Sequence, residues 1–136
     1  MGYVRARVLI GDASKRKVKE VVFLVDTGAF FPVIPLYLAK ELGIEPLAKT
    51  KLLMAGNREA TVNISLAYFR VLDREGVFPV VLMDSPEPLL GAVVLEGLGI
   101  KVDLATGRLE YSRPYGLALL SIISNLLLYY KYSSFN

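Results

Sequence analysis

The chain has 136 residues, of which 54% are hydrophobic and 21% charged, and its net charge is +3. This length and composition are typical of one compact domain and exclude an intrinsically disordered chain. The sequence contains no cysteine and no histidine, which excludes disulfides, thiol nucleophiles, serine–histidine catalysis and the most common metal ligands.

The basic residues are scattered along the chain rather than gathered into a stripe. The densest group contains four of them between positions 15 and 19, where a hairpin turn is expected. A solvated turn therefore explains this group better than a nucleic-acid surface, and no nucleic-acid partner is expected. The first ten residues carry Arg5 and Arg7 but no long apolar stretch. They do not resemble a signal peptide, and a cytoplasmic location is expected.

Two strands and a helix are predicted in the first third of the chain. Tyr3 to Ile10 alternates apolar and polar residues, and Gly11-Asp12 is a turn signal. Val18 to Val25 becomes continuously apolar towards its end, which is typical of a strand buried on both faces. Residues 35–42 favour a short helix, with Pro35 at its first position and Gly43 as its stop signal.

The middle of the chain predicts further strands. Strands at 51–54 and 61–72 flank the Gly56-Asn57 pair and form a hairpin. Residues 73–76 read as a polar turn before a strand from Val77 to Met83.

A loop bounded by prolines then leads to the last elements of the domain. Ala92 to Leu98 has helical character, and Gly99 ends it. The segments 100–104 and 108–111 predict a final hairpin. We therefore expect a domain over 1–112 and an extension over 113–136.

The extension is strongly apolar. Nearly every residue from Leu117 to Tyr130 is apolar, and the run is shorter than the roughly 20 residues that span a bilayer. A helix that is buried or packed across a dimer is the favoured interpretation. Lys131 and the neighbouring tyrosines would suit a membrane interface, so association with a membrane remains the alternative.

One short motif carries the chemistry. Asp26 follows the apolar strand directly, and small residues come after it. In isolation such an aspartate is a turn residue or a helix N-cap. The motif occurs once, and no internal repeat supplies a second copy. A catalytic pair of aspartates would therefore require two copies of the chain.

Three features together resemble the retropepsin-like aspartic proteases over about Tyr3 to Tyr111. They are Asp26-Thr27-Gly28-Ala29, the Gly56-Asn57 hairpin tip, and Leu89-Leu90-Gly91 before a helix. Within that helix, residues 95–99 are similar to those of cellular and prokaryotic members. The resemblance implies a closed, mostly β acid-protease barrel with one or two short helices, active as a homodimer. The apolar tail is expected to add a helix.

The resemblance also implies a role for each residue of the motifs. Asp26 would be the catalytic carboxylate, with Thr27, Gly28 and Ala29 supporting it. Leu89, Leu90 and Gly91 would form a structural loop element. The substrate-binding flap would consist of Met54, Ala55, Gly56, Asn57 and Arg58. The expected partners are a second copy of the chain and an extended peptide, and no metal or cofactor is expected.

Other residues have weaker expectations. Asp12, Asp73, Asp84 and Asp103 are expected at turns or on the surface, and Arg58 is expected to be solvated. An apolar substrate preference follows if the cleft is lined by Val33, Ile34, Val80 and Leu82.

The chain departs from the viral members at two positions. Those members often carry an aspartate after Asp-Thr-Gly-Ala and an arginine after the apolar-apolar-Gly element, and these charges pair. Here the positions hold Phe30 and Ala92. Because both charges are replaced, neither is left buried without its partner. Our hypothesis is that apolar packing takes over the role of the ion pair in the dimer.

Two alternatives to a peptidase remain open. The same fold can serve as a peptide-binding or dimerisation module without catalysis, because a fold does not establish an activity. The third hypothesis is a membrane-associated peptidase or sensor anchored by its tail.

Overall fold

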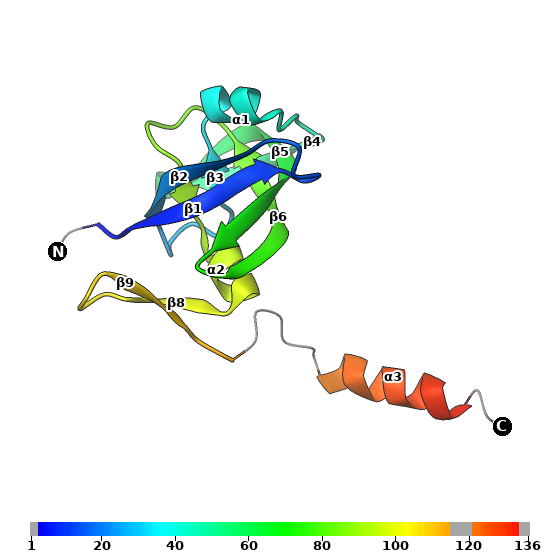
Figure 1. Cartoon of the computed structure of the whole chain (residues 1–136). Helices are drawn as coiled ribbons and strands as arrows, with labels where there is room; N and C mark the ends of the chain where they lie inside the picture. The colour runs from blue at the N-terminus through cyan, green and yellow to red at the C-terminus, as the bar shows by residue number, and fades with distance from the viewer. Residues whose placement is uncertain (1–2, 115–120, 134–136) are drawn as a thin grey trace.

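Six strands form a closed ring (Figure 1). The order around the ring is β1 (Arg5–Asp12), β2 (Val18–Val25), β7 (Leu89–Leu90), β3 (Val33–Ile34), β6 (Arg74–Leu82) and β5 (Arg58–Val71). The ring closes because β5 pairs with β1 as well as with β6. This computed structural model describes residues 3–114 and 121–133, and in the second range the side chains of 127–133 only. The predicted closed, mostly β barrel is confirmed.

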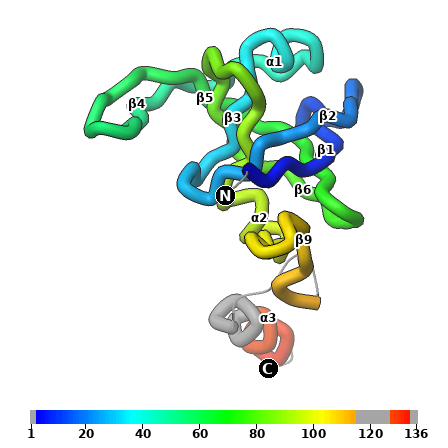
Figure 2. The backbone as a smooth tube through the Cα atoms, turned by 90° about the vertical axis from the view of Figure 1, so that its left-hand side faces the viewer, coloured from blue at the N-terminus to red at the C-terminus, as the bar shows by residue number. Residues whose placement is uncertain are grey.

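The β4–β5 hairpin extends from this ring. β4 (Ala48–Met54) pairs only with the first half of β5, and the short helix η1 (Ala55–Asn57) forms the tip. From Asn63 onwards β5 pairs with β6, and from Ala67 it also pairs with β1. Figure 2 shows the hairpin reaching away from the barrel. One long strand therefore belongs to the hairpin at its start and to the ring at its end.

The apolar core fills the interior of the ring. Its largest fully buried side chains include Phe23 from β2, Phe69 from β5 and Leu90 from β7. The rings of Phe23 and Phe69 meet edge to face at 6.0 Å. The expectation that β2 is buried on both faces is wrong, because Phe23 is fully buried but its neighbour Val22 is 50% exposed. Successive side chains of a strand point to opposite faces, and only one face of β2 meets the core.

Two helices begin and end close to the predicted residues. α1 (Leu36–Leu42) ends at Gly43 with φ 70°, and α2 (Ala92–Leu98) ends at Gly99 with φ 67°. Both glycines adopt the left-handed conformation that terminates helices. Pro35 precedes α1 as its N-cap residue rather than opening the helix.

The predicted turn at Gly11-Asp12 is wrong, because β1 continues through both residues. Gly11 pairs with Val18 of β2 and with Tyr68 of β5. A Cβ atom at this position would lie 2.5 Å from the carbonyl oxygen of Lys17. The glycine marks a close approach of two backbones within the sheet rather than its end.

The predicted polar turn at 73–76 is also wrong. The turn consists of Leu72 and Asp73, since Val71 already pairs with Arg74 across the hairpin. Leu72 adopts φ 56°, which is uncommon for a leucine. Pairing along the whole length of β5 and β6 determines the turn here, rather than the local preference of the residues.

A separate two-stranded sheet, β8 (Ile100–Asp103) and β9 (Arg108–Tyr111), follows α2. Arg74 of β6 attaches it to the barrel. Its guanidinium group donates hydrogen bonds to the carbonyl oxygens of Leu98, Gly99 and Arg113, at 3.0, 3.1 and 2.9 Å. The same group lies 4.0 Å from the centre of the Tyr111 ring.

The tail contains the predicted helix, α3 (Ser121–Ser133). Residues 117–120 of the apolar run lie outside the described residues. The side chains from Leu127 to Ser133 are exposed, so this part of the helix is not buried against its own chain. Packing across a dimer stays a prediction. Among the described helices, none has the length and apolar character needed to cross a membrane.

Candidate active site

Asp26 is held at the end of β2 by its neighbour β7. Leu24 and Val25 pair in parallel with Leu89 and Leu90, and the Asp26 N–H donates to the Leu90 carbonyl oxygen at 3.1 Å. The Ala29 N–H donates back to the Asp26 carbonyl oxygen at 3.1 Å and closes a tight turn. The backbone that carries the carboxylate is therefore fixed from both sides.

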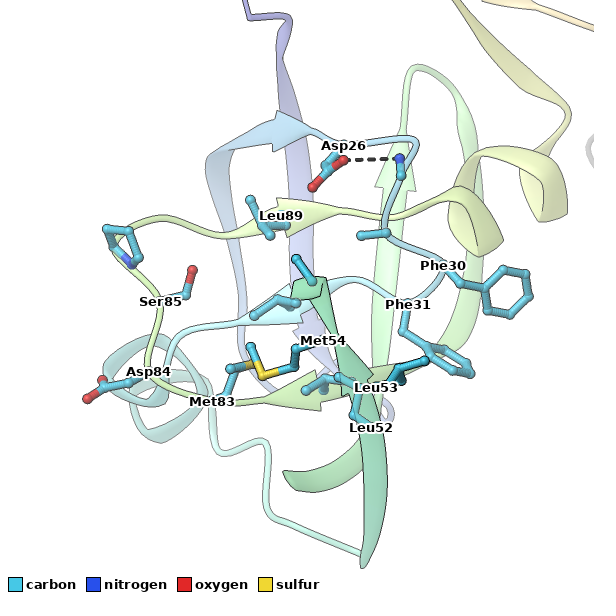
Figure 3. Close-up of a pocket in the computed structure, with 16 residues that line it drawn as sticks. Asp26, Phe30, Phe31, Leu52, Leu53, Met54, Met83, Asp84, Ser85 and Leu89 are labelled. Atoms are coloured by element: carbon cyan, nitrogen blue, oxygen red, sulfur yellow. Dashed lines mark hydrogen bonds between the residues drawn. The ribbon is translucent and has the colours of Figure 1, made fainter. Parts of the chain in front are cut away.

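The carboxylate itself is half-buried and has one hydrogen-bond donor. The Gly28 N–H donates to its Oδ1 atom at 3.0 Å (Figure 3). A Cβ atom at residue 28 would lie 3.2 Å from the same oxygen. Glycine at this position therefore keeps the space beside the carboxylate open.

The N-terminus of α2 braces the loop that follows Asp26. No side chain caps this helix. Instead, the N–H groups of Ala92 and Val93 donate to the carbonyl oxygens of Ala29 and Phe30, at 2.8 and 2.9 Å. These bonds satisfy donors that a helix start leaves unpaired. The Asp26 loop and the helix are thus joined as one unit.

Gly91 makes this junction possible. A Cβ atom there would lie 2.5 Å from the carbonyl carbon of Phe31 and 2.7 Å from the carbonyl oxygen of Phe30. Both are backbone atoms, so they have no flexible side chain that can move aside. This contact gives the physical reason for a glycine after the two leucines.

A cavity of about 570 Å³ opens beside Asp26. One wall comes from the loop after β2, another from β4 of the hairpin, and a third from the end of β6 and the loop behind it (Figure 3). Polar side chains are few in this lining. It consists of Asp26, Gly28, Ala29, Phe30, Phe31, Val33, Leu52, Leu53, Met54, Ala55, Val81, Met83, Asp84, Ser85, Pro86 and Leu89.

The structure brings some of the predicted site residues to this cavity and leaves others away from it. Asp26, Gly28, Ala29, Met54, Ala55 and Leu89 line it. Thr27 is exposed beside it, and Leu90 and Gly91 are buried behind it. Gly56, Asn57 and Arg58 are exposed at the hairpin tip, outside the lining.

Three of the four predicted cleft residues do not line the cavity, and on β6 the prediction is wrong by one position. Val33 lines the cavity as expected, but Ile34, Val80 and Leu82 are buried in the core. Since successive side chains of a strand point to opposite faces, Val81 and Met83 are the ones that reach the cavity. Alternation alone leaves open which of its two faces a strand buries.

Three aspartates outside the cavity are engaged in local hydrogen bonds. Asp73 and Asp103 lie at turns as expected, whereas Asp12 is the buried last residue of β1. The Lys17 N–H and the Arg16 side chain donate to Asp12 at 2.9 and 3.0 Å and hold the pKa of this carboxyl below its usual value. The Tyr111 hydroxyl does the same for the pKa of Asp73. The Ala105 N–H, at 2.9 Å, lowers the pKa of Asp103.

Asp84 is exposed at the surface, as expected, and it also lines the outer part of the cavity. The sequence shows only an aspartate before a proline-bounded loop. The signal that identifies it is spatial, since the loop from 84 to 88 leads directly back to β7 beside Asp26. Within the described residues, no three acidic side chains are grouped as they would be to hold a metal ion.

Comparison with known proteins agrees with this geometry. A family model described as aspartyl protease matches residues 6–107, a range that contains the barrel, Asp26 and the Leu89-Leu90-Gly91 element. The chain belongs to this aspartyl protease family. A search among curated proteins found no match.

A solved structure gives the same fold for this aspartyl protease. It is EIAV protease in complex with the inhibitor HBY-793, which superposes with a TM-score of 0.58 at 23% sequence identity. The match covers 76% of this chain and 94% of the viral one. The retropepsin-like fold expected from the sequence is therefore confirmed.

Proposed function

We propose that this protein is an aspartic endopeptidase that works as a homodimer, with one Asp26 from each copy at the shared site. The observation that carries the proposal is that Asp26 lines an apolar cavity whose one other acidic lining residue among those described, Asp84, lies at the opposite end (Figure 3). Exposure of Thr27, Gly28 and Phe30 beside it leaves this edge of the site available to a second copy.

Two such carboxylates facing each other would share one proton, because like charges a few ångströms apart do not both ionise cheaply. The ionised Asp26 takes a proton from a water molecule, whose oxygen attacks the peptide carbonyl carbon. The protonated Asp26 donates a hydrogen bond to the carbonyl oxygen. When the tetrahedral intermediate collapses, a proton passes to the amide nitrogen and the C–N bond breaks.

The β4–β5 hairpin would act as the flap over the substrate. Leu52, Leu53 and Met54 of β4 already line the cavity. At the tip, Gly56 and Asn57 adopt φ values of 77° and 61°, which suit glycine and asparagine. An extended peptide between flap and floor would pair through its backbone with both.

The test combines the native mass in solution with cleavage of an unstructured protein between about pH 3 and pH 7. We expect a dimer with an acidic optimum, because the shared proton has to be retained. Asp26→Asn should abolish cleavage, with a loss of at least about a hundredfold. Asp103→Asn makes the same chemical change in a surface turn and should retain activity.

The possible results separate the hypotheses. A dimer that binds peptides but never cleaves them would favour a binding module of the same fold. A monomer would leave Asp26 without a partner and would refute the proposed mechanism.

A further inference from the structure

We propose that Asp84 makes the outer end of the cleft a subsite for a lysine or arginine side chain of the substrate. This inference rests on the proposed peptidase function and adds a substrate class to it. A basic side chain of the substrate would bind at this end. Because the proposed dimer has two such ends, the basic residue can precede or follow the bond that is cut.

The charges of the cavity point to a cationic ligand. Its lining contains two aspartates, Asp26 and Asp84, and no lysine or arginine. All its other side chains are apolar, apart from Ser85. A cleft with negative charge and low-dielectric walls attracts positively charged groups.

Among the residues that the structure describes, Asp84 differs from the other aspartates in having no partner. Asp12, Asp73 and Asp103 accept hydrogen bonds from nearby groups, and Asp26 accepts one from Gly28. Within the described part of the chain, the Asp84 carboxylate takes part in no hydrogen bond or ion pair. It is therefore available to a group that comes from outside.

The loop that carries Asp84 is held in place by other groups. The Arg5 guanidinium pairs with Glu87 at 3.2 Å, and the Ser85 hydroxyl donates to the Glu87 carbonyl oxygen at 2.6 Å. Glu87 thus has its own counter-charge, which leaves Asp84 as the uncompensated carboxylate of this loop. A fixed loop lowers the entropic cost of binding a ligand at its carboxylate.

The position of Asp84 suits a long side chain. In Figure 3 Asp26 and Asp84 lie at opposite ends of the cavity, and the Asp84 carboxylate faces away from Asp26 towards the outside. Lysine and arginine have long aliphatic stems that cover apolar surface while the charged end stays near water. Here Met83 provides apolar surface next to Asp84.

The symmetry of the proposed dimer makes the inference more specific. Two copies would place one Asp84 at each end of the combined cleft. A basic residue should therefore favour cleavage whether it precedes or follows the cut bond. A peptide with basic residues on both sides should gain the product of the two effects.

The test compares peptides that differ at one position, with lysine replaced by norleucine, scanned across both sides of the cleavage site. At the best position we expect lysine to raise kcat/KM about two- to fivefold, as for an exposed ion pair. The preference should weaken in 1 M salt, where such pairs are screened. In Asp84→Asn the lysine-to-norleucine ratio should fall to about one, and Asp84→Lys should favour glutamate instead. Glu96→Gln removes the same charge from the exposed face of α2 and should keep the wild-type ratio.

A second measurement keeps this inference separate from catalysis. Binding of the same peptides to the Asp26→Asn variant, followed by fluorescence anisotropy, should show the same preference for lysine without any cleavage. Equal ratios in wild type and Asp84→Asn, in either assay, would overturn the subsite. If the wild-type protein cleaves none of the peptides but binds the lysine peptides more tightly, the peptidase proposal is refuted and the subsite is supported. If no peptide binds or is cleaved, both proposals are wrong.

Discussion

Arg74 is expected to contribute more to stability than any other exposed or half-buried charge of the barrel. Its guanidinium group donates to three carbonyl oxygens at 2.9 to 3.1 Å and stacks on Tyr111. At about 1 kcal/mol for each hydrogen bond and up to about 1 kcal/mol for the stacking, Arg74→Ala should lower the free energy of unfolding by about 3–4 kcal/mol. Two of the three acceptors lie at the C-terminal end of α2, where a positive charge is favourable.

The assay is urea unfolding followed by circular dichroism, at one protein concentration, because dimerisation makes stability concentration-dependent. Arg108→Ala serves as the control, since this arginine of β9 is exposed and its side chain forms no hydrogen bond or ion pair within the described residues. It should change stability by less than about 0.5 kcal/mol. If Arg74→Ala lowers the free energy of unfolding by less than about 1 kcal/mol, the β8–β9 sheet is held to the barrel by other contacts.

Three further predictions follow from the site and its surroundings. Gly91→Ala should cost about 3 kcal/mol of unfolding free energy because of its collision with backbone. Gly107→Ala, which meets no atom within 4 Å but has φ 70°, should cost about 1–2 kcal/mol; the reverse order in thermal or urea unfolding would contradict the steric argument. The lowered pKa of Asp12 means that its ionised form stabilises the fold above the unfolded pKa of about 3.9, and that this contribution is lost as pH falls through the folded pKa. The stability difference between wild type and Asp12→Asn should therefore be constant at neutral pH and shrink below about pH 4 in urea titrations. Phe30 is 56% exposed, and burying it in a dimer is worth about 1 kcal/mol per copy. Phe30→Ala should raise the dimer dissociation constant at least about tenfold in sedimentation equilibrium, and an unchanged constant would refute apolar packing at this position.

The sequence predicts β2 and α2 with the bounds that the structure has. Both have strong local signals, an apolar run ending at Asp26 and a glycine that ends the helix in the left-handed conformation. Gly11 and residues 74–76 have equally clear turn signals and yet lie in strands. There the long antiparallel pairings of β1, β5 and β6 outweigh local preference.

The candidate site is predictable in part for a related reason. Asp26 and its small neighbours form a contiguous motif, so their proximity follows from the chain itself. The lining by Val81 and Met83 depends on which face of β6 the barrel buries. The position of Asp84 depends on the path of a loop between two strands that are not neighbours in the ring. Neither property is encoded within a few residues, so the sequence alone does not reveal them.

The closure of the barrel through β1 and β5 has a consequence for the hairpin. β4 takes no part in the pairing that closes the ring. On β5, the residues paired with β4 and those paired with β6 overlap only at Asn63 and Ile64. The backbone pairing of the hairpin therefore meets that of the ring only at these two residues, and a change near the hairpin tip leaves the pairs of the ring in place. Loop grafts that lengthen the segment between Leu53 and Glu59 should leave the melting temperature of the barrel almost unchanged while altering which peptides it accepts.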